Sequence, residues 1–489
     1  MNYFVLFYIL GTVCLFEGAF MLVPLITALI YQEYSIAVVY VLCILMCCLI
    51  GGVLLVISGN NRQIHAKEGM IAVALSWLVL SLLGALPFFI SQEIPSYIDA
   101  FFETVSGFTT TGSTILTDVG KMSYANRIWR SFTHWVGGMG VIVFILSLLP
   151  SKGGGFMNLM TAESPGPDVS KIVPKVRDTA KTLYIIYIGM TLIQLVLLLL
   201  AGMELFDAIT LTMGTAGTGG FAVRSDGFAS YTLLQTGIIA VFMMLFGINF
   251  SFYVLLLRGK VKQAIRMEEV LSYLGIILAS VTIIVISVRS LFPDLFLAIH
   301  HVFFTVSSII TTTGYATVDF NQWAPVAQII LVLLMICGAC AGSTGGGFKV
   351  SRINIVLKGI KKEFSTLIHP RSVKKVRMDG KPIPHEIVRS VNVFLAIYIC
   401  VFVVSLILIS IDGKDLVTNF TAVAATLNNI GPGLGEVGPM GSFAHFSPFA
   451  KLVFSFDRLA GRLELLPLLL LFLPSMWLVR SRRKTSDRD

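Results

Sequence analysis

The sequence predicts an all-α polytopic membrane protein in which four copies of one unit follow an N-terminal helix pair. Three observations support this prediction. First, 56% of the 489 residues are hydrophobic and only 13% are charged, whereas soluble domains carry about 25% charged residues. Second, apolar stretches long enough to cross a bilayer recur along the whole chain. Third, four short loops that contain glycine lie roughly a hundred residues apart, which is typical of a repeated folding unit.

The apolar stretches have the length of about 20 residues that a membrane-spanning helix needs. They fall near 4–30, 37–58, 69–91, 128–150, 182–202, 232–257, 270–292, 324–341, 388–411 and 449–479. The first one, MNYFVLFYIL, lacks a basic region and a small-residue cleavage site, so we interpret it as a retained span and not as a signal peptide. The first two spans lack the loop pattern and are expected to form a separate two-helix unit over residues 1–66.

The basic residues indicate how the chain is oriented. They gather in every second loop and at the end of the chain, near 62–67, 152–181, 258–266, 349–389 and 481–489. By the positive-inside rule these loops, both termini and the basic tail 481–489 face the cytoplasm. The net charge of +9 therefore reflects membrane orientation and does not indicate nucleic-acid binding. The remaining loops are acidic, which would either concentrate cations at an outer mouth or simply form a solvated face.

A short apolar stretch precedes each glycine loop and is too short to cross a bilayer. These stretches are Ile98 to Phe108, Phe206 to Gly214, Leu295 to Ile309 and Leu416 to Leu427. Their length predicts re-entrant half-helices, and an aspartate near each start is favoured by the helix dipole. The repeated unit is therefore span, pore helix, loop and span. We expect four such units, over 67–152, 178–260, 266–365 and 385–480.

The four loops indicate what surrounds the central axis. They read Thr110-Thr111-Gly112, Thr218-Gly219-Gly220, Thr312-Thr313-Gly314 and Asn429-Ile430-Gly431. Irregular backbone at membrane depth is tolerated only where it is buried in protein or lines a water-filled path. Four such loops around one axis would form a ring of carbonyl oxygens that replaces the water around a cation. The sequence therefore predicts an ion pore, and the alternative is that these glycines only serve helix packing.

The motifs resemble one known family. TTTGST (109–114), TTTGYAT (311–317), LNNIGPGLGEVGP (427–439) and CGACAGSTGGGFKVSR (337–352) are similar to the TrkH branch of the Trk/Ktr/HKT potassium-uptake superfamily. The resemblance covers nearly the whole chain. It implies four joined potassium-channel-like units around one pore, with potassium as the transported ion and the backbone carbonyls of the twelve loop residues named above as its ligands. The second loop departs from the Thr-Thr-Gly form.

Two further features lie within apolar spans. Residues 338–347 contain too many glycines to hold a helix, because each costs about 1 kcal/mol relative to alanine. Arg462 lies inside the last span, where a charge is by default a functional hypothesis. The alternatives are a packing kink for 338–347 and a structural pair with a neighbouring helix for Arg462. The resemblance implies instead an obstructing gate made of this loop, with Gly342, Gly345, Gly346 and Gly347, and of Arg462 in the pore beside it.

The resemblance also implies partners and a location. It implies a homodimer in a bacterial inner membrane that sits on a cytosolic ring of nucleotide-binding RCK-type subunits similar to TrkA. We expect loops 152–181 and 349–389 to form the docking surface. The runner-up function is a secondary transporter that couples potassium to sodium or protons, since discontinuous helices also mark transporter sites.

An enzyme is not expected, because the sequence shows no cluster of His, Asp and Cys residues that would converge at membrane depth. The seven cysteines form no disulfide framework or zinc spacing. His300-His301 lacks a carboxylate at useful spacing for a metal site. Gly433 to Gly438 matches a dinucleotide fingerprint, but no predicted strand precedes it.

Overall fold

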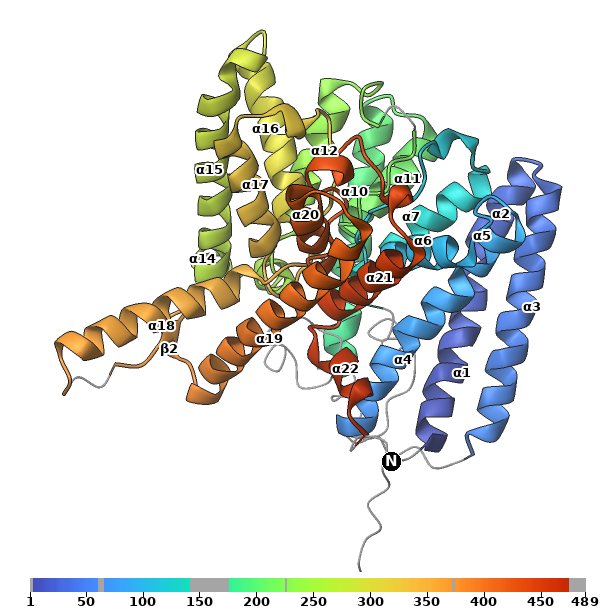
Figure 1. The fold of residues 1–489 in the computed structure, drawn as a ribbon, viewed down its shortest axis with the longest axis horizontal. Helices are drawn as coiled ribbons and strands as arrows, with labels where there is room; N and C mark the ends of the chain where they lie inside the picture. Colours follow the sequence, from blue (N-terminus) through green and yellow to red (C-terminus); the bar gives the residue numbers. More distant parts are fainter. Residues whose placement is uncertain (1–2, 60–65, 141–175, 225–226, 372–373, 475–489) are drawn as a thin grey trace, which may run out of the picture.

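The computed structural model describes residues 3–59, 66–140, 176–224, 227–371 and 374–474 (Figure 1). Within this part of the chain, six helical segments are long and apolar enough to cross a membrane, and the bent pair α12–α13 makes a seventh if it counts as one span. The six segments are Tyr3–Ile30, Tyr34–Ile57, Glu68–Ile90, Ala180–Leu200, Glu268–Leu291 and His385–Asp412. The chain is a multi-pass, all-α membrane protein.

An N-terminal helix pair lies at one edge of the molecule (Figure 1). It consists of α1 (Tyr3–Phe20), continued by α2 (Leu22–Ile30), and of α3 (Tyr34–Ile57). Gly11 and Gly51 allow α1 and α3 to lie close together, because a Cβ atom on either residue would come within 2.9 Å of the carbonyl oxygen of the other. Small residues allow this close approach of membrane helices.

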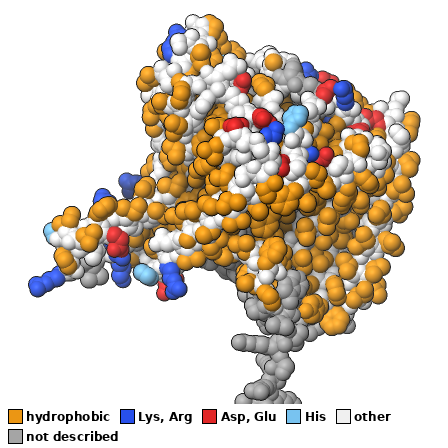
Figure 2. Space-filling model, viewed as in Figure 1, with side chains coloured by type: hydrophobic (Ala, Val, Ile, Leu, Met, Phe, Trp, Pro, Cys, Tyr) orange, Lys and Arg blue, Asp and Glu red, His pale blue; other side chains and the backbone are white. Residues whose placement is uncertain are grey.

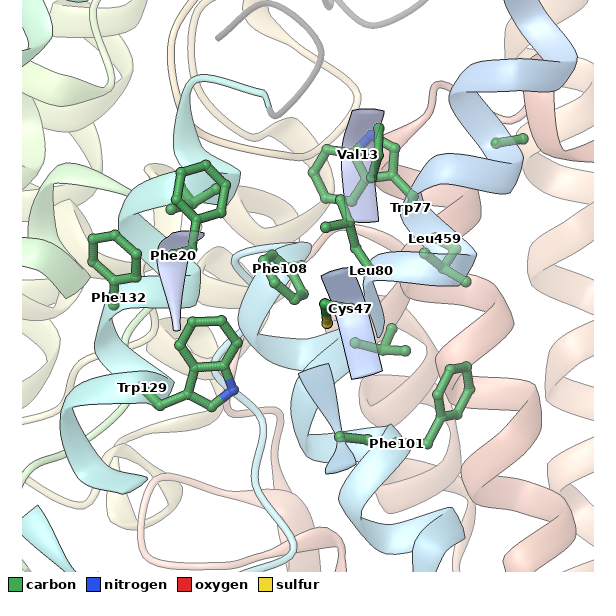
Figure 3. Close-up of a cluster of buried hydrophobic side chains, with 14 of the residues drawn as sticks. Val13, Phe20, Cys47, Trp77, Leu80, Phe101, Phe108, Trp129, Phe132 and Leu459 are labelled. Carbon is green, nitrogen blue, oxygen red and sulfur yellow. The ribbon is translucent and has the colours of Figure 1, made fainter. Parts of the chain in front are cut away.

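The first repeated unit packs directly on this pair. It comprises α4 (Ala66–Gly84), α5 (Leu86–Ile90), the short helix α6 (Tyr97–Phe108) and α7 (Tyr124–Gly138). Figure 3 shows the shared core, which joins side chains from α1, α3, α4, α6, α7 and α21. Its labelled members are Val13, Phe20, Cys47, Trp77, Leu80, Phe101, Phe108, Trp129, Phe132 and Leu459. The helix pair therefore supports the outer side of the first short helix.

Three more units follow in the chain. The second contains α10 (Val176–Leu200), α11 (Leu205–Ala216), α12 (Leu233–Phe246), α13 (Phe250–Leu257) and α14 (Val261–Ile265). The third contains α15 (Glu268–Val288), α16 (Leu295–Ile310), α17 (Pro325–Cys337) and α18 (Val350–Ile368). The hairpin of β1 (Arg377–Met378) and β2 (Lys381–Pro382) leads to the fourth, with α19 (His385–Ile409), α20 (Leu416–Leu427), α21 (Pro448–Arg462) and α22 (Leu466–Leu469). Single 3-10 turns are η1 (Val119–Lys121), η3 (Arg289–Leu291), η4 (Phe320–Gln322), η5 (Ser410–Asp412), η6 (Gly435–Val437), η7 (Phe443–His445) and η8 (Leu470–Phe472).

Two of the predicted spans are interrupted, which corrects the sequence-based boundaries. The span predicted near 232–257 bends by 89° between α12 and α13. The span predicted near 449–479 breaks after Arg462, because Glu464 and Leu465 have positive φ angles of 56° and 63° that no helix contains. In the span predicted near 128–150, α7 ends at Gly138 and the residues from 141 on lie outside the described part.

The four predicted half-helices are confirmed as α6, α11, α16 and α20, which begin and end within two residues of the expected positions. Asp294 and Asp415 cap α16 and α20 by accepting hydrogen bonds from the Leu297 and Thr418 amides at 2.7 and 3.1 Å. In α6 the cap is Ser96 rather than Asp99, which lies in the first turn. These caps satisfy amides that have no partner within a helix. The aspartates are therefore helix-start signals.

Hydrophobic and charged side chains occupy different parts of the surface. Figure 2 shows hydrophobic side chains over the flanks of the molecule, with lysine and arginine on the projecting arm at lower left. That arm is formed by α18, the β hairpin and the start of α19 (Figure 1). Acidic and basic side chains also gather at the upper end in this view (Figure 2). The apolar flanks suit a lipid environment.

Candidate functional site

The four short helices end in the same turn. The residue after each helix cap has a left-handed conformation: φ is 55° at Thr110, 53° at Thr218, 61° at Thr312 and 58° at Asn429. A β-branched residue such as threonine rarely adopts this conformation, so its recurrence at equivalent positions is informative. Strained backbone of this kind persists only where the surroundings hold it, often at functional sites.

The hydrogen bonds of these turns are also the same. In each loop the amide one residue further on donates to the carbonyl five residues earlier, as in the Schellman motif. The bonds are Thr111 to Ser106 (2.9 Å), Gly219 to Gly214, Thr313 to Ser308 and Ile430 to Ala425 (2.8 Å each). The second loop therefore has the same backbone register as the others, although its sequence departs from Thr-Thr-Gly.

The loops meet in one closed ring, which the glycines reveal. A Cβ atom at Gly112 would overlap the carbonyl of Gly219, and one at Gly220 would overlap the carbonyl of Thr313. A Cβ atom at Gly314 would lie 2.8 Å from the amide nitrogen of Gly431. One at Gly431 would lie 3.2 Å from the carbonyl of Gly112, which closes the circle. The structure thus brings together all four predicted loops, in chain order around one axis.

The carbonyl oxygens of the ring are available. Among the described residues, none donates a hydrogen bond to the carbonyls of the predicted ligands Thr110, Thr111, Gly112, Thr218, Gly219, Gly220, Thr312, Thr313, Gly314, Asn429, Ile430 and Gly431. Two of the threonine hydroxyls bind within the protein: Thr111 and Thr313 each contact a neighbouring threonine hydroxyl at 2.8 Å. Buried carbonyls without donors are unusual. Their chemistry suits a cation that has lost its water.

Two buried arginines brace the ring, and sequence reasoning missed both roles. Arg130 forms an ion pair with Glu103 at 2.7 Å, with 2% and 0% of the side chains exposed. Its guanidinium also lies 4.0 Å from the ring centroid of Phe221 in the second loop. Arg458 donates to the Ser113 hydroxyl at 2.7 Å. A charged residue inside an apolar helix was the available signal for both.

The glycine-rich segment 338–347 forms a loop against one end of the ring. Its neck is closed by hydrogen bonds from Phe348 to the Ile336 carbonyl (3.0 Å) and from Lys349 to the Cys337 carbonyl (2.9 Å). The Gly346 amide donates to the Thr312 hydroxyl at 2.6 Å. A Cβ atom on Gly346 would overlap the carbonyl of Asn428, next to the fourth loop. Segment 338–347 therefore touches the third and fourth units at the base of the ring.

Arg462 lies beside this segment. Its Nη1 atom donates to the Thr344 carbonyl at 2.9 Å, and its Nη2 atom donates to the carbonyls of Gly138, at 2.8 Å, and Gly137. Arg462 thus links the end of α21 to the loop and to the end of α7. The nearby Glu464 forms an ion pair with Arg352.

Comparisons with known proteins agree with this geometry. Residues 36–480 match the family described as TrkH, cation transport protein. The chain belongs to this family. It is 36% identical to the Trk system potassium uptake protein TrkH of Salmonella typhimurium over 473 residues, which cover 95% of this chain and 97% of that protein. It is 34% identical to the Trk system potassium uptake protein TrkG of Escherichia coli, over 94% and 95% of the two chains.

A solved structure supports the fold of this TrkH-family chain. The crystal structure of the potassium transporter TrkH from Vibrio parahaemolyticus superimposes with a TM-score of 0.87 at 31% identity. The match covers 98% of this chain and 100% of that one. The resemblance drawn from the loop motifs is therefore confirmed, as is the all-helical membrane fold.

Proposed function

We propose that this TrkH-family chain is the pore-forming subunit of a potassium uptake system in a bacterial inner membrane. The observation that carries the proposal is the closed ring of four loops whose carbonyl oxygens accept no hydrogen bond from the described residues. Oxygens in this state bind a dehydrated monovalent cation well. The relatives named above are potassium uptake proteins, which supports potassium as the ion.

Selectivity for potassium belongs to the ring. Each loop is held by a Schellman turn, by contacts with the next loop and by buried side chains, so the carbonyls have a defined spacing. Selectivity depends on the number of carbonyl ligands and on their field strength. The twelve carbonyls of the ring would supply several successive coordination shells along the axis. No resident cofactor is needed for this function, because potassium itself is the cargo.

Control of the flux belongs to segment 338–347 and Arg462. The segment lies against the base of the ring, and the positive charge of Arg462 lies beside it. A positive charge close to a cation path in a medium of low dielectric opposes conduction. The function of these residues is to obstruct the pore until the loop moves.

The loop is moved by a cytosolic partner. We infer a homodimer seated on a ring of RCK-type nucleotide-binding subunits, with the arm of α18 and the β hairpin as docking surface. Lys374, Lys375 and Arg377 are exposed on this arm and offer positive charge to such a partner. The other expected docking segment, 152–181, lies almost wholly outside the described residues.

The test is ion flux with the purified protein in liposomes. With the cytosolic ring and its nucleotide present, a potassium gradient without any other ion gradient should drive uptake and sodium should permeate poorly, and without the ring the rate should be lower. If uptake instead requires an added sodium or proton gradient, the protein is a symporter and the channel-like mechanism is wrong. If no potassium moves under any of these gradients, the proposal itself fails.

A further inference from the structure

Glu269 is a buried carboxylate that the proposed conduction path does not use. It lies in the first turn of α15, with 7% of the residue exposed. One carboxylate oxygen, Oε1, accepts hydrogen bonds from the Ala341 amide at 2.6 Å and from the Ser351 amide at 3.2 Å. The other, Oε2, accepts from Asn249 Nδ2 at 3.1 Å. A buried amide that loses such an acceptor is left without a partner, which strongly disfavours the arrangement.

The two amides flank the apex of the obstructing loop. Ala341 lies near its start, and Ser351 lies just beyond its end in the first turn of α18. A single oxygen atom therefore holds both sides of segment 338–347. Because the two amides are ten residues apart in the chain, movement of the loop away from the ring would break at least one of these bonds.

The bend between α12 and α13 also binds the start of segment 338–347. The Cys340 amide donates to the Gly247 carbonyl at 3.1 Å, and the Phe250 amide donates to the Gly342 carbonyl at 3.0 Å. Asn249, at this bend, connects it to Glu269. The 89° break between α12 and α13 thus exposes the backbone groups that bind the loop.

The residue before Glu269 contacts the cytoplasmic arm. The Glu268 amide donates to Oδ1 of Asp379 at 2.8 Å, in the turn of the β hairpin. The Glu268 side chain pairs with Lys358 of α18, and Lys358 also donates to the Arg377 carbonyl at 2.9 Å. The start of α15 therefore contacts the hairpin through one residue and the loop through the next.

We propose that Glu269 is the positioning residue that keeps segment 338–347 in its obstructing place, and that Glu268 connects it to the β hairpin. The proposal rests on the pore function proposed above. A displacement of the hairpin would then shift the start of α15 and release the two amides from Oε1. Glu269 would act through the loop and would not contact the ion.

Cysteine labelling tests this proposal without relying on conduction. Cys340 lies in the loop and is fully buried, so its rate of reaction with a small methanethiosulfonate reagent, followed by mass spectrometry, reports loop release. Glu269→Met keeps most of the side-chain volume but removes the acceptor, and should raise Cys340 labelling and potassium flux at least about tenfold. Glu269→Gln retains one carbonyl oxygen for both amides but replaces Oε2, the acceptor for Asn249 Nδ2, by an amide nitrogen, so its Cys340 labelling should lie between that of wild type and that of Glu269→Met.

The controls separate loop release from general loosening. Cys47, buried in the N-terminal pair, should label at an unchanged rate in every variant, and the potassium-to-sodium permeability ratio should not move. Glu363→Gln, an exposed carboxylate on α18, should match wild type when measured without a partner. If Glu269→Met does not fold, Glu269→Asp replaces it. The aspartate side chain is shorter by one methylene, so its carboxylate oxygens lie farther from the two amides, and Cys340 labelling must rise in this variant too.

The hairpin connection has its own pair of variants. Asp379→Ala should raise Cys340 labelling about threefold, whereas Asp379→Asn retains an acceptor oxygen and should not. Equal labelling in Glu269→Met and Glu269→Gln would overturn the positioning role, and unchanged labelling in Asp379→Ala would overturn the hairpin connection. An absence of potassium flux both in wild type and in a Glu269→Met variant with raised Cys340 labelling would instead refute the proposed function, since Cys340 labelling does not depend on conduction.

Discussion

The Cα atom of Gly112 lies so close to the carbonyl group of Gly219 that a Cβ atom at position 112 would overlap the oxygen. The first and second loops are therefore in direct backbone contact. The same relationship joins Gly220 to Thr313 in the next pair of loops. A side chain at either glycine must displace the carbonyl of the next loop, so the spacing of the ring depends on these residues.

Substitution of a ring glycine should reduce selectivity. Gly112→Ser would push the Gly219 carbonyl outward and leave a ring less matched to potassium. We expect the permeability ratio of potassium to sodium to fall at least about tenfold, equivalent to about 1.4 kcal/mol of discrimination. Reversal potentials under mixed-ion conditions would measure it. Gly275→Ser is the control, because no atom lies within 4 Å of a Cβ atom at that position. An unchanged ratio in Gly112→Ser would exclude this filter assignment.

Removal of the loop 342–346, which we propose obstructs the pore, should raise the potassium flux. Gly338 and Gly347 lie against each other at the neck, so deletion of residues 342–346 leaves ends that can rejoin. The deletion should increase potassium flux and preserve the preference for potassium. A folded deletion variant with wild-type flux would show that the loop does not limit conduction.

Loss of the Arg462 charge should also raise the potassium flux. A unit charge on the order of 8 Å from the path raises the energy of a cation by about 2 kcal/mol at an effective dielectric constant of about 20. Arg462→Ala should therefore raise potassium flux at least about tenfold. Arg289→Ala, at an exposed arginine outside the pore, should leave the flux unchanged. Equal flux in Arg462→Ala and wild type would remove the electrostatic barrier from the mechanism.

The buried pair of Arg130 and Glu103 should matter for stability and for the ring. Arg130→Met leaves the Glu103 carboxylate buried without its cation, which typically costs about 3–5 kcal/mol. We expect a lower midpoint of thermal unfolding in detergent together with weaker potassium selectivity. The double variant Arg130→Met with Glu103→Gln should recover much of the stability, because no unpaired charge remains. Additive losses in the double variant would contradict direct coupling between the two residues.

Charge reversal on the cytoplasmic arm should weaken partner binding. Changing Lys374, Lys375 and Arg377 to glutamate removes exposed positive charge without touching the Lys358 contact, which uses the Arg377 carbonyl. Co-purification with an RCK-type ring, and the response of flux to nucleotide, should both decrease. Lys121→Glu, with 83% of its side chain exposed at a different loop, is the matched control. Normal binding by the triple variant would place the docking surface elsewhere.

The short helices and the loops could be predicted from the sequence because their signals are local. Apolar stretches of half-span length, aspartates at the starts and Thr/Gly residues at the ends specify α6, α11, α16 and α20 without tertiary information. The bend at 247–249 could not be predicted in this way. Residues 232–257 are predominantly apolar and read as one continuous span. The helix breaks where the backbone of segment 338–347 takes over its hydrogen bonds.

The sequence by itself therefore determined the class of molecule and the four repeated turns. It also determined two interruptions of apolar spans, namely the glycine-rich segment 338–347 and the charged residue Arg462. Tertiary structure alone decided which groups meet: Gly112 with Gly219, Arg130 with Glu103, and Glu269 with the amides of Ala341 and Ser351. The physical reason is the distance along the chain between the residues that interact. Helix caps and left-handed turns are set by neighbours within a few residues, whereas a buried carboxylate finds its donors only when distant segments pack against it.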